Sequence, residues 1–216
     1  MGLLQKFRFF MEHGGVTAFM IIGSALALLA ISLERLVVLY LQMPLGSSET
    51  IKRVRELILN RHYSQALQVC NQQPDCPEFT VMRATIASID SGREAMKSAL
   101  NDALIKVAHR AETRLQFLAL VANAATLLGL LGTISGLIKT FSGIAEADAT
   151  EKARLLGIGI SEAMYATAAG LSVGLAAMIL HTICASRADS IILKSQSAGM
   201  SIWTWIEQAE RVKKHG

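Results

Sequence analysis

Glu162 is the residue of this sequence with the clearest potential for chemistry, because it is the single charged residue of a long apolar segment, residues 155–186. Another apolar segment, residues 115–138, contains no charged residue. Each is longer than the roughly 20 apolar residues that span a bilayer core of about 30 Å. A carboxylate at that depth is costly and is by default a candidate functional group. Because Glu162 follows Arg154 by only eight residues, the sequence leaves equally open that it reaches the outer interface and stays solvated.

Threonines of the 115–138 segment and its continuation recur every seven residues, at Thr126, Thr133 and Thr140. Seven residues rotate a helix by about 700°, so successive threonines drift by only about 20° and share one side. A threonine hydroxyl in a membrane helix can bond to its own backbone, which explains a single threonine well. A repeated stripe favours a hydrated or helix-facing surface, and we expect Thr133 to face a lumen.

Thr167 is a hydroxyl residue of the 155–186 segment and lies beside the row of small residues of that segment. It lies about 140° of helical rotation from Glu162, at about 100° per residue. On an ideal helix the two side chains therefore edge a wide cavity at most and do not form a tight pair.

Small residues recur three or four apart in both segments, which is the pattern of helices that pack closely against other helices in a membrane. Their density predicts a ring-forming oligomer. The residues that we expect to mediate this packing are Gly129, Gly132, Gly136, Gly170 and Gly174.

The elements that must position these side chains are helices. The chain is 52% hydrophobic and only 18% charged, whereas a soluble domain carries about 25% charged residues. No stretch alternates with period two over several strands, which argues against a β-barrel. A third apolar stretch, residues 16–33, follows Lys6 and Arg8 as a signal peptide would, but it is long and ends at Glu34 rather than at a small-residue cleavage site. We therefore expect a retained span and an all-α membrane protein.

The distribution of lysine and arginine predicts the orientation. Eleven of these residues lie between 34 and 116 and five after 186, against two before the first span and three between 139 and 154. Basic residues accumulate on the cytoplasmic side, so we expect the N-terminus outside and the C-terminus inside. The basic pI needs no nucleic-acid partner. The expected parts are an N-terminal interfacial segment (1–15), transmembrane helix 1 (16–41), a cytoplasmic helical region (42–114), transmembrane helix 2 (115–138), a periplasmic loop (139–154), transmembrane helix 3 (155–186) and a cytoplasmic tail (187–216).

Long helical extensions into the cytoplasm are a further expectation. Residues 93–141 contain no proline, and no glycine before Gly129, which predicts one continuous helix. The third span continues without a breaker to about Ser197. Residues 48–70 carry apolar side chains at helical spacing, and residues 71–77 form a break.

No catalytic constellation is visible, so we expect neither an enzyme nor a cofactor. Cys70 and Cys76 have five residues between them, which is not a zinc spacing, and no cluster of paired ligands follows. We interpret these cysteines, and Cys184, as structural residues.

Two motifs carry a resemblance to a known family. Gly-Leu-Leu-Gly-Thr-Ile-Ser-Gly-Leu-Ile-Lys-Thr-Phe at 129–141 and Gly-Ile-Ser-Glu-Ala-Met-Tyr-Ala-Thr-Ala-Ala-Gly-Leu at 159–171 resemble the paired signature of the MotA/TolQ/ExbB proton-channel family. The three spans point to its TolQ/ExbB branch. The chain departs from the family pattern at Thr126 and Ala176, where the family usually has proline.

The resemblance implies a function. It implies a pentamer in the bacterial inner membrane, whose second and third spans line a pore around a single-span partner similar to ExbD or TolR. That partner supplies a membrane aspartate, which the spans of this chain lack, and a protein similar to TonB or TolA receives the energy. Thr133, Thr167 and Glu162 then match the family's pore-lining residues. Proton or sodium as the transported ion stays open, as do a non-conducting scaffold and a stator for gliding or other motility.

Overall fold

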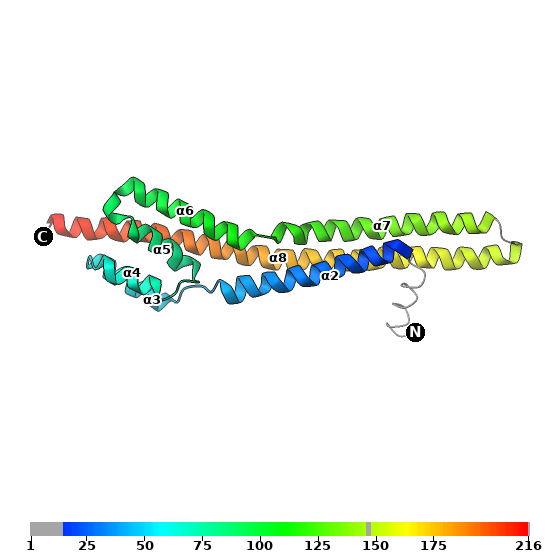
Figure 1. The fold of residues 1–216 in the computed structure, drawn as a ribbon, viewed down its shortest axis with the longest axis horizontal. Coiled ribbons are helices and arrows are strands. Elements are labelled where there is room, and N and C mark those ends of the chain that lie inside the picture. Colours follow the sequence, from blue (N-terminus) through cyan, green and yellow to red (C-terminus); the bar gives the residue numbers. More distant parts are fainter. Residues whose placement is uncertain (1–14, 146–147, 216) are drawn as a thin grey trace. The chain divides into compact units, whose positions relative to one another are not determined.

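A computed structural model describes residues 15–145 and 148–215 of the chain, and every element in these ranges is a helix (Figure 1). The N-terminal segment expected at 1–15 lies outside the described residues except for Gly15. The elements are α2 (Gly15–Val37), the π-helix η1 (Val38–Gln42), α3 (Ser48–Leu59), α4 (Tyr63–Asn71), α5 (Pro77–Ala87), the 3-10 helix η2 (Ile89–Ser91), α6 (Arg93–Glu112), α7 (Leu115–Ala145) and α8 (Ala149–His215).

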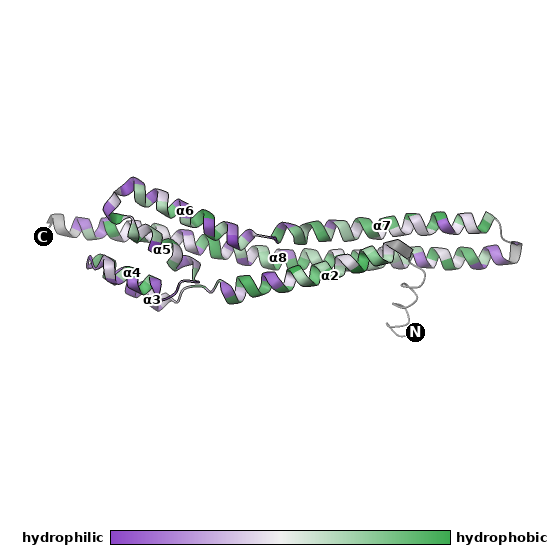
Figure 2. Cartoon of the chain, in the orientation of Figure 1, coloured by the Kyte–Doolittle hydropathy of each residue, from purple (hydrophilic) through white to green (hydrophobic). Residues whose placement is uncertain are grey.

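Three stretches of the described chain are long and apolar enough to cross a membrane. They fall within Thr17–Gln42, Arg93–Ala145 and Glu151–Arg211. Figure 2 shows the hydrophobic residues that follow one another along α2, along α7 and along part of α8. Large apolar side chains such as Leu127 and Met164 are 64% and 66% exposed, as expected for surfaces that face lipid or another subunit.

The continuous helix expected over 93–141 is wrong, because the chain breaks between α6 and α7. Thr113 has an extended ψ of 133°, and Arg114 has a φ of +62°, which is uncommon for a residue other than glycine. The Thr113 carbonyl leaves the helical hydrogen-bond pattern and accepts from Nη1 of the buried Arg35 at 2.6 Å. The Arg114 guanidinium forms an ion pair with Glu34. These contacts with the end of α2 stabilise a break that no local residue signals.

The last helix is longer than expected. We expected it to continue to about Ser197, and α8 runs without interruption for 67 residues, to His215. Residues 155–186 are therefore the apolar part of a helix that also extends into a more polar stretch.

The chain divides into two compact units. We call residues 1–34 and 114–182 the span unit, and residues 35–113 and 183–216 the core unit. The long helix α8 contributes residues to both.

Local sequence explains the short helices of the core unit. The Ser47 hydroxyl caps α3 by accepting from the Thr50 N–H at 3.2 Å, which satisfies one of the donors that a helix start leaves free. Pro77 opens α5 at a position where its missing N–H costs nothing. The residues expected to be helical at 48–70 form two helices, separated by a turn in which Arg61 has a φ of +62°.

The hydrophobic core of the core unit gathers side chains from α3, α4, α5, α6 and the C-terminal part of α8. Helix α5 is its centre, since most of its side chains are buried. The largest fully buried side chains include Phe79, Met82, Ile58, Val54 and Ile202.

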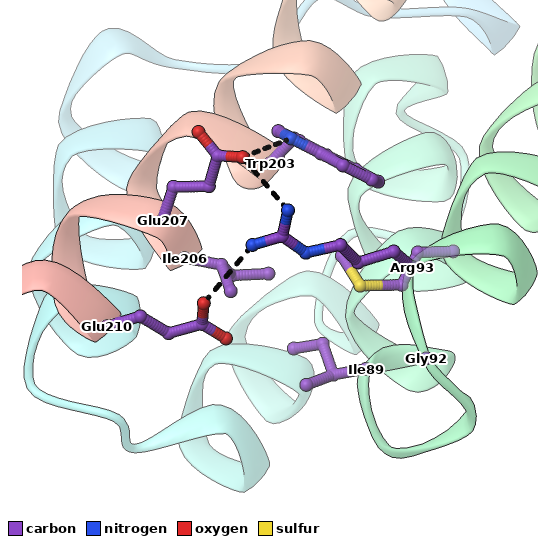
Figure 3. Close-up of a pocket in the computed structure, with 8 residues that line it drawn as sticks. Ile89, Gly92, Arg93, Trp203, Ile206, Glu207 and Glu210 are labelled. Atoms are coloured by element: carbon purple, nitrogen blue, oxygen red, sulfur yellow. Dashed lines mark hydrogen bonds and ion pairs between the residues drawn. The ribbon is translucent and has the colours of Figure 1, made fainter.

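One polar contact closes the edge of this core (Figure 3). The Arg93 guanidinium at the start of α6 lies 5.9 Å from the centre of the Trp203 ring. It also forms ion pairs with Glu207 at 3.7 Å and Glu210 at 3.4 Å. A cavity of about 130 Å³ beside it is thus lined by one guanidinium that is paired with two carboxylates.

Candidate functional site between α7 and α8

Glycines bring α7 and α8 of the span unit into close backbone contact. A Cβ atom added at Gly170 would lie 2.6 Å from the Gly129 Cα and 2.6 Å from the Ala125 carbonyl oxygen. Both neighbours are backbone atoms, so no side chain can move aside to make room. The two helices can approach to this distance only because both positions lack a side chain.

The other predicted packing glycines lie in the same contact. A Cβ at Gly132 would lie 2.7 Å from the Ala166 Cβ, and one at Gly136 would lie 3.3 Å from the Ala163 Cβ. A Cβ at Gly174 would lie 3.0 Å from the Ala122 carbonyl oxygen. Small residues of one helix therefore meet small residues of the other over about three turns.

Thr133 and Thr167 meet in the middle of this contact. Their hydroxyl oxygens lie within hydrogen-bond distance of each other, and either can donate. The Gly129 carbonyl oxygen lies 3.2 Å from the Thr133 hydroxyl and 3.1 Å from the Thr167 hydroxyl, the second of which is on α8. Because each hydroxyl has one hydrogen, two of these three contacts are hydrogen bonds at any moment. Both side chains are half-buried. Two hydroxyl groups and one carbonyl thus form a small polar network between two apolar helices.

The remaining threonines of the stripe also face α8. Thr126 and Thr140 donate to the carbonyls of Ala122 at 3.0 Å and Gly136 at 2.7 Å. The Thr126 hydroxyl lies beside Gly174, and Thr140 lies against Gly159. Both hydroxyl groups therefore donate to carbonyl groups of α7 itself, and within one chain the stripe faces α8. That Thr133 faces a lumen stays a prediction.

Glu162 is not joined to the threonine pair by any contact in the described residues. It is half-buried, and five residues separate it from Thr167, which is about 7.5 Å along a helix. Within residues 15–145 and 148–215, no hydrogen bond or ion pair engages its carboxylate. The arginine nearest in sequence, Arg154, is engaged by Glu151 at the exposed start of α8, and this hydrogen bond lowers the pKa of Glu151.

Helix α2 adds a neighbour that the sequence did not indicate. The Thr17 hydroxyl oxygen would lie 3.5 Å from a Cβ at Gly132, and Ala18 and Ile21 pack against Ala166. Thr17 thus approaches the α7–α8 contact from the first span. The one feature of the sequence that could have indicated Thr17 is its position in the first turn of an apolar helix. The seven-residue spacing of the other threonines concerns α7 alone and gives no information about α2.

This arrangement offers hydroxyl groups and a carbonyl along a helix pair, with one carboxylate about a turn and a half away. Hydroxyls can pass a proton along hydrogen bonds or coordinate a small cation, but they do not titrate near neutral pH. Among the described residues, no group of three or more histidines, cysteines or acids could hold a metal ion.

Comparison with known proteins gives concordant results. The model of the MotA/TolQ/ExbB proton channel family matches residues 73–197, which is more than half of the chain. The chain is 33% identical over 99 residues to the biopolymer transport protein exbB1 of Vibrio cholerae, covering 46% of this chain and 43% of that protein. It is 31% identical over 103 residues to the Tol-Pal system protein TolQ of Pseudomonas aeruginosa, covering 48% and 44%. The matched part is thus less than half the length of these two relatives.

Longer matches exist at lower identity. A putative biopolymer transport protein, ExbB-like 3 of Synechocystis, is 29% identical over 176 residues, covering 79% of this chain and 80% of that protein. Among solved structures, that of C. jejuni MotAB matches with a TM-score of 0.64 over 89% of this chain and 78% of that chain, at 14% identity. At that identity the likeness concerns the fold.

Proposed function

The chain belongs to the MotA/TolQ/ExbB proton channel family, and we propose that it is the ring-forming subunit of an inner-membrane motor driven by the proton-motive force. The family is one of membrane proton channels and not of enzymes. In the proposed motor the chain and a single-span partner conduct protons to energise transport or envelope processes. One charge that crosses the membrane releases about 2.3 kcal/mol per 100 mV, so several protons per cycle suffice to move a helix pair inside a ring.

The observation that carries this proposal is the hydroxyl pair of Thr133 and Thr167 between two apolar helices. Their half-buried hydroxyls leave a polar edge on the helix pair. In a ring of such pairs, this edge would face a shared central path. Glu162 would then lie toward the outer mouth of the path and receive the ion.

A partner is needed because the spans contain no aspartate: Asp148 precedes the third span and Asp189 follows it. We propose that a single-span protein similar to ExbD or TolR supplies the membrane aspartate. A protein similar to TonB or TolA would carry the motion outward. The N-terminus lies outside and the C-terminus inside, in keeping with the sixteen lysines and arginines between 34 and 116 and after 186.

A non-conducting scaffold is the second candidate, and one observation favours it. The Thr167 hydroxyl of α8 lies within hydrogen-bond distance of the Gly129 carbonyl and of the Thr133 hydroxyl of α7, so the pair also joins the two helices. Such hydrogen bonds between membrane helices contribute about 0.6 kcal/mol on average. A scaffold of this kind would tolerate loss of a hydroxyl with a small cost in stability and none in ion-coupled work.

Substitution in cells distinguishes the two functions. Thr133→Val keeps the shape and removes the hydroxyl, and Glu162→Gln removes the charge. We expect both variants to abolish the ion-coupled process while the oligomer and its partner remain assembled. Leu128→Val is the packing control and should retain full activity.

Full activity of both variants at normal expression would favour the scaffold. Loss with Glu162→Gln alone would place the important protonation at the outer mouth and leave the threonines as packing residues. Native mass spectrometry in detergent tests the ring, for which we expect a pentamer; a spectrum with monomer only would contradict it.

A further inference from the structure

A cavity of about 160 Å³ in the core unit has properties that the proposed motor does not use. Its floor is apolar and buried, and its rim carries charged, exposed side chains. The residues that line it are Met43, Asp75, Pro77, Thr80, Lys106, Val107 and Arg110. An apolar cavity of about 150 Å³ holds a benzene molecule, so this one has room for a group of roughly six to eight non-hydrogen atoms.

The charges of this cavity are not neutralised by the protein. Lys106 and Arg110 lie one turn apart on α6, and Asp75 precedes α5. In the part of the chain that the structure describes, none of the three makes a hydrogen bond or an ion pair. The cavity beside Arg93 is the opposite case, since there the guanidinium is held by two carboxylates (Figure 3).

Donors and acceptors are both present at the rim. Lys106 and Arg110 offer only donors, while the Asp75 carboxylate offers only acceptors. The Thr80 hydroxyl donates its hydrogen to the Cys76 carbonyl at 3.1 Å, so toward the cavity it can still accept. A ligand that matches this set carries a negative acceptor group and a positive donor group.

Two residues of the cavity are close in sequence to the candidate spans. Met43 follows directly on Gln42, where the first candidate span ends. Arg110 lies five residues before Leu115, where α7 begins. Tyr40 and Leu41, just before Met43, are 49% and 74% exposed, and tyrosine is typical of the interface between lipid and water.

We propose that this cavity binds the phosphoethanolamine headgroup of a membrane lipid. Lys106 and Arg110 donate to the phosphate oxygens, and Asp75 with the Thr80 oxygen accepts from the ammonium group. The ester oxygen that leads to the glycerol points out of the cavity toward the bilayer. The proposal rests on the membrane location of the spans and not on proton conduction, so either can fail without the other.

Lipid retention on the purified oligomer tests the proposal. The protein is reconstituted in nanodiscs with equal parts of phosphatidylethanolamine, phosphatidylglycerol and phosphatidylcholine, extracted in mild detergent, and its bound lipids are quantified by native mass spectrometry. We expect enrichment of phosphatidylethanolamine. The double variant Lys106→Ala, Arg110→Ala should lose it by at least about tenfold, because each charge-assisted hydrogen bond is worth about one decade or more in affinity.

Two further variants make the test specific. Lys97→Ala removes an exposed cation from the same helix away from the cavity and should retain the lipid. Asp75→Asn should lose the preference for phosphatidylethanolamine over phosphatidylglycerol. Once bound lipid has been removed, the wild type and the three variants should melt at the same temperature, since the changed residues are exposed.

Equal retention by the double variant and by Lys97→Ala would overturn the proposal. A thermal shift with inorganic phosphate in detergent is the remaining arm. If millimolar phosphate stabilises the wild type and not the double variant while no lipid is enriched, the cavity is a site for free phosphate and the lipid assignment is wrong.

Discussion

The helices inside one unit of this protein are packed through large side chains, and those inside the other are packed through very small ones. The core unit buries large residues, with Phe79, Met82 and Ile58 at 0% exposure. In the span unit the α7–α8 contact is made by residues with little or no side chain, such as Gly129 and Gly170. Both contacts join helices, but they are stabilised by different forces.

The difference follows from the solvent. In water, apolar area that leaves the solvent contributes about 25 cal/mol per Å², so large side chains stabilise most. In a bilayer the lipid tails are as apolar as leucine, so burial of apolar area contributes little. Helix contacts are stabilised there by dispersion and hydrogen bonds between closely packed backbones. The two contacts should therefore be sensitive to opposite changes. Loss of side-chain volume should destabilise the core unit, and added volume should destabilise the α7–α8 contact.

Phe79→Ala should have the largest effect of the substitutions considered for stability. It removes a fully buried ring at the centre of the core unit, and such changes cost about 3–5 kcal/mol. We expect a strongly lowered thermal midpoint of the core unit, followed by circular dichroism in detergent. Ile105→Ala, at a side chain that is 58% exposed, is the control; an equal loss there would show that burial does not decide the effect.

Gly170→Ala should come next, because it adds one methyl group where only backbone atoms surround it. The new Cβ would lie 2.6 Å from the Gly129 Cα, so the helices must separate, at a cost of about 1–3 kcal/mol. We expect reduced thermal stability and a weakened oligomer in size-exclusion chromatography.

Gly143→Ala is the matched control on α7, since nothing lies within 4 Å of its Cβ position. Alanine is favoured over glycine within a helix by about 0.5–1 kcal/mol, so this variant should be neutral or stabilised. Destabilisation of both variants to the same extent would contradict the packing described for Gly170.

Arg93→Ala should have a small effect. The Arg93 side chain is 65% exposed, and an exposed ion pair contributes about 0–1 kcal/mol. Its position over Trp203 adds a cation–π contact of similar size. We expect a shift of the melting temperature of a few degrees at most, reduced further by salt. A loss as large as that of Phe79→Ala would show that this polar edge, and not the apolar core, holds the core unit together.

Cys70 should show no reaction at all under conditions that label an exposed thiol. Burial raises its pKa to about 11, so roughly one molecule in a thousand carries a thiolate at pH 8. We expect no maleimide labelling of Cys70 in the folded protein and full labelling after denaturation. Rapid labelling in the native state would mean that the core around α4 opens readily.

Much of this fold could be predicted from the sequence, because its signals are local. Three long apolar stretches predict three spanning helices, and Pro77 marks the start of α5. The break between α6 and α7 could not be predicted. The contact that stabilises it comes from the buried guanidinium of Arg35, 78 residues before Thr113 in the chain, and neither a proline nor a glycine stands at the break itself. The orientation of the termini stays a prediction from the charges.

The candidate site divides in the same way. The seven-residue spacing of Thr126, Thr133 and Thr140 predicted that they share one face, and the structure places this face against α8. The pairing of Thr133 with Thr167 is a tertiary contact over 34 residues, and only the family resemblance assigned the two residues a shared role. Thr17 was missed because its approach depends on how α2 packs, which periodicity within one helix does not contain.

Proton flux through the assembled complex tests most directly whether the Thr133 hydroxyl serves conduction. The chain and the proposed single-span partner are reconstituted in vesicles, and a pH-sensitive dye follows proton entry under an imposed potential. Thr133→Ser keeps the hydroxyl and Thr133→Val removes it. Thr182→Val removes a hydroxyl with the same bond to its own helix, at 2.9 Å to the Met178 carbonyl, but on an exposed face. We expect flux with Thr133→Ser and Thr182→Val near the wild type and none with Thr133→Val; equal flux in all three variants would contradict a role of this hydroxyl in conduction.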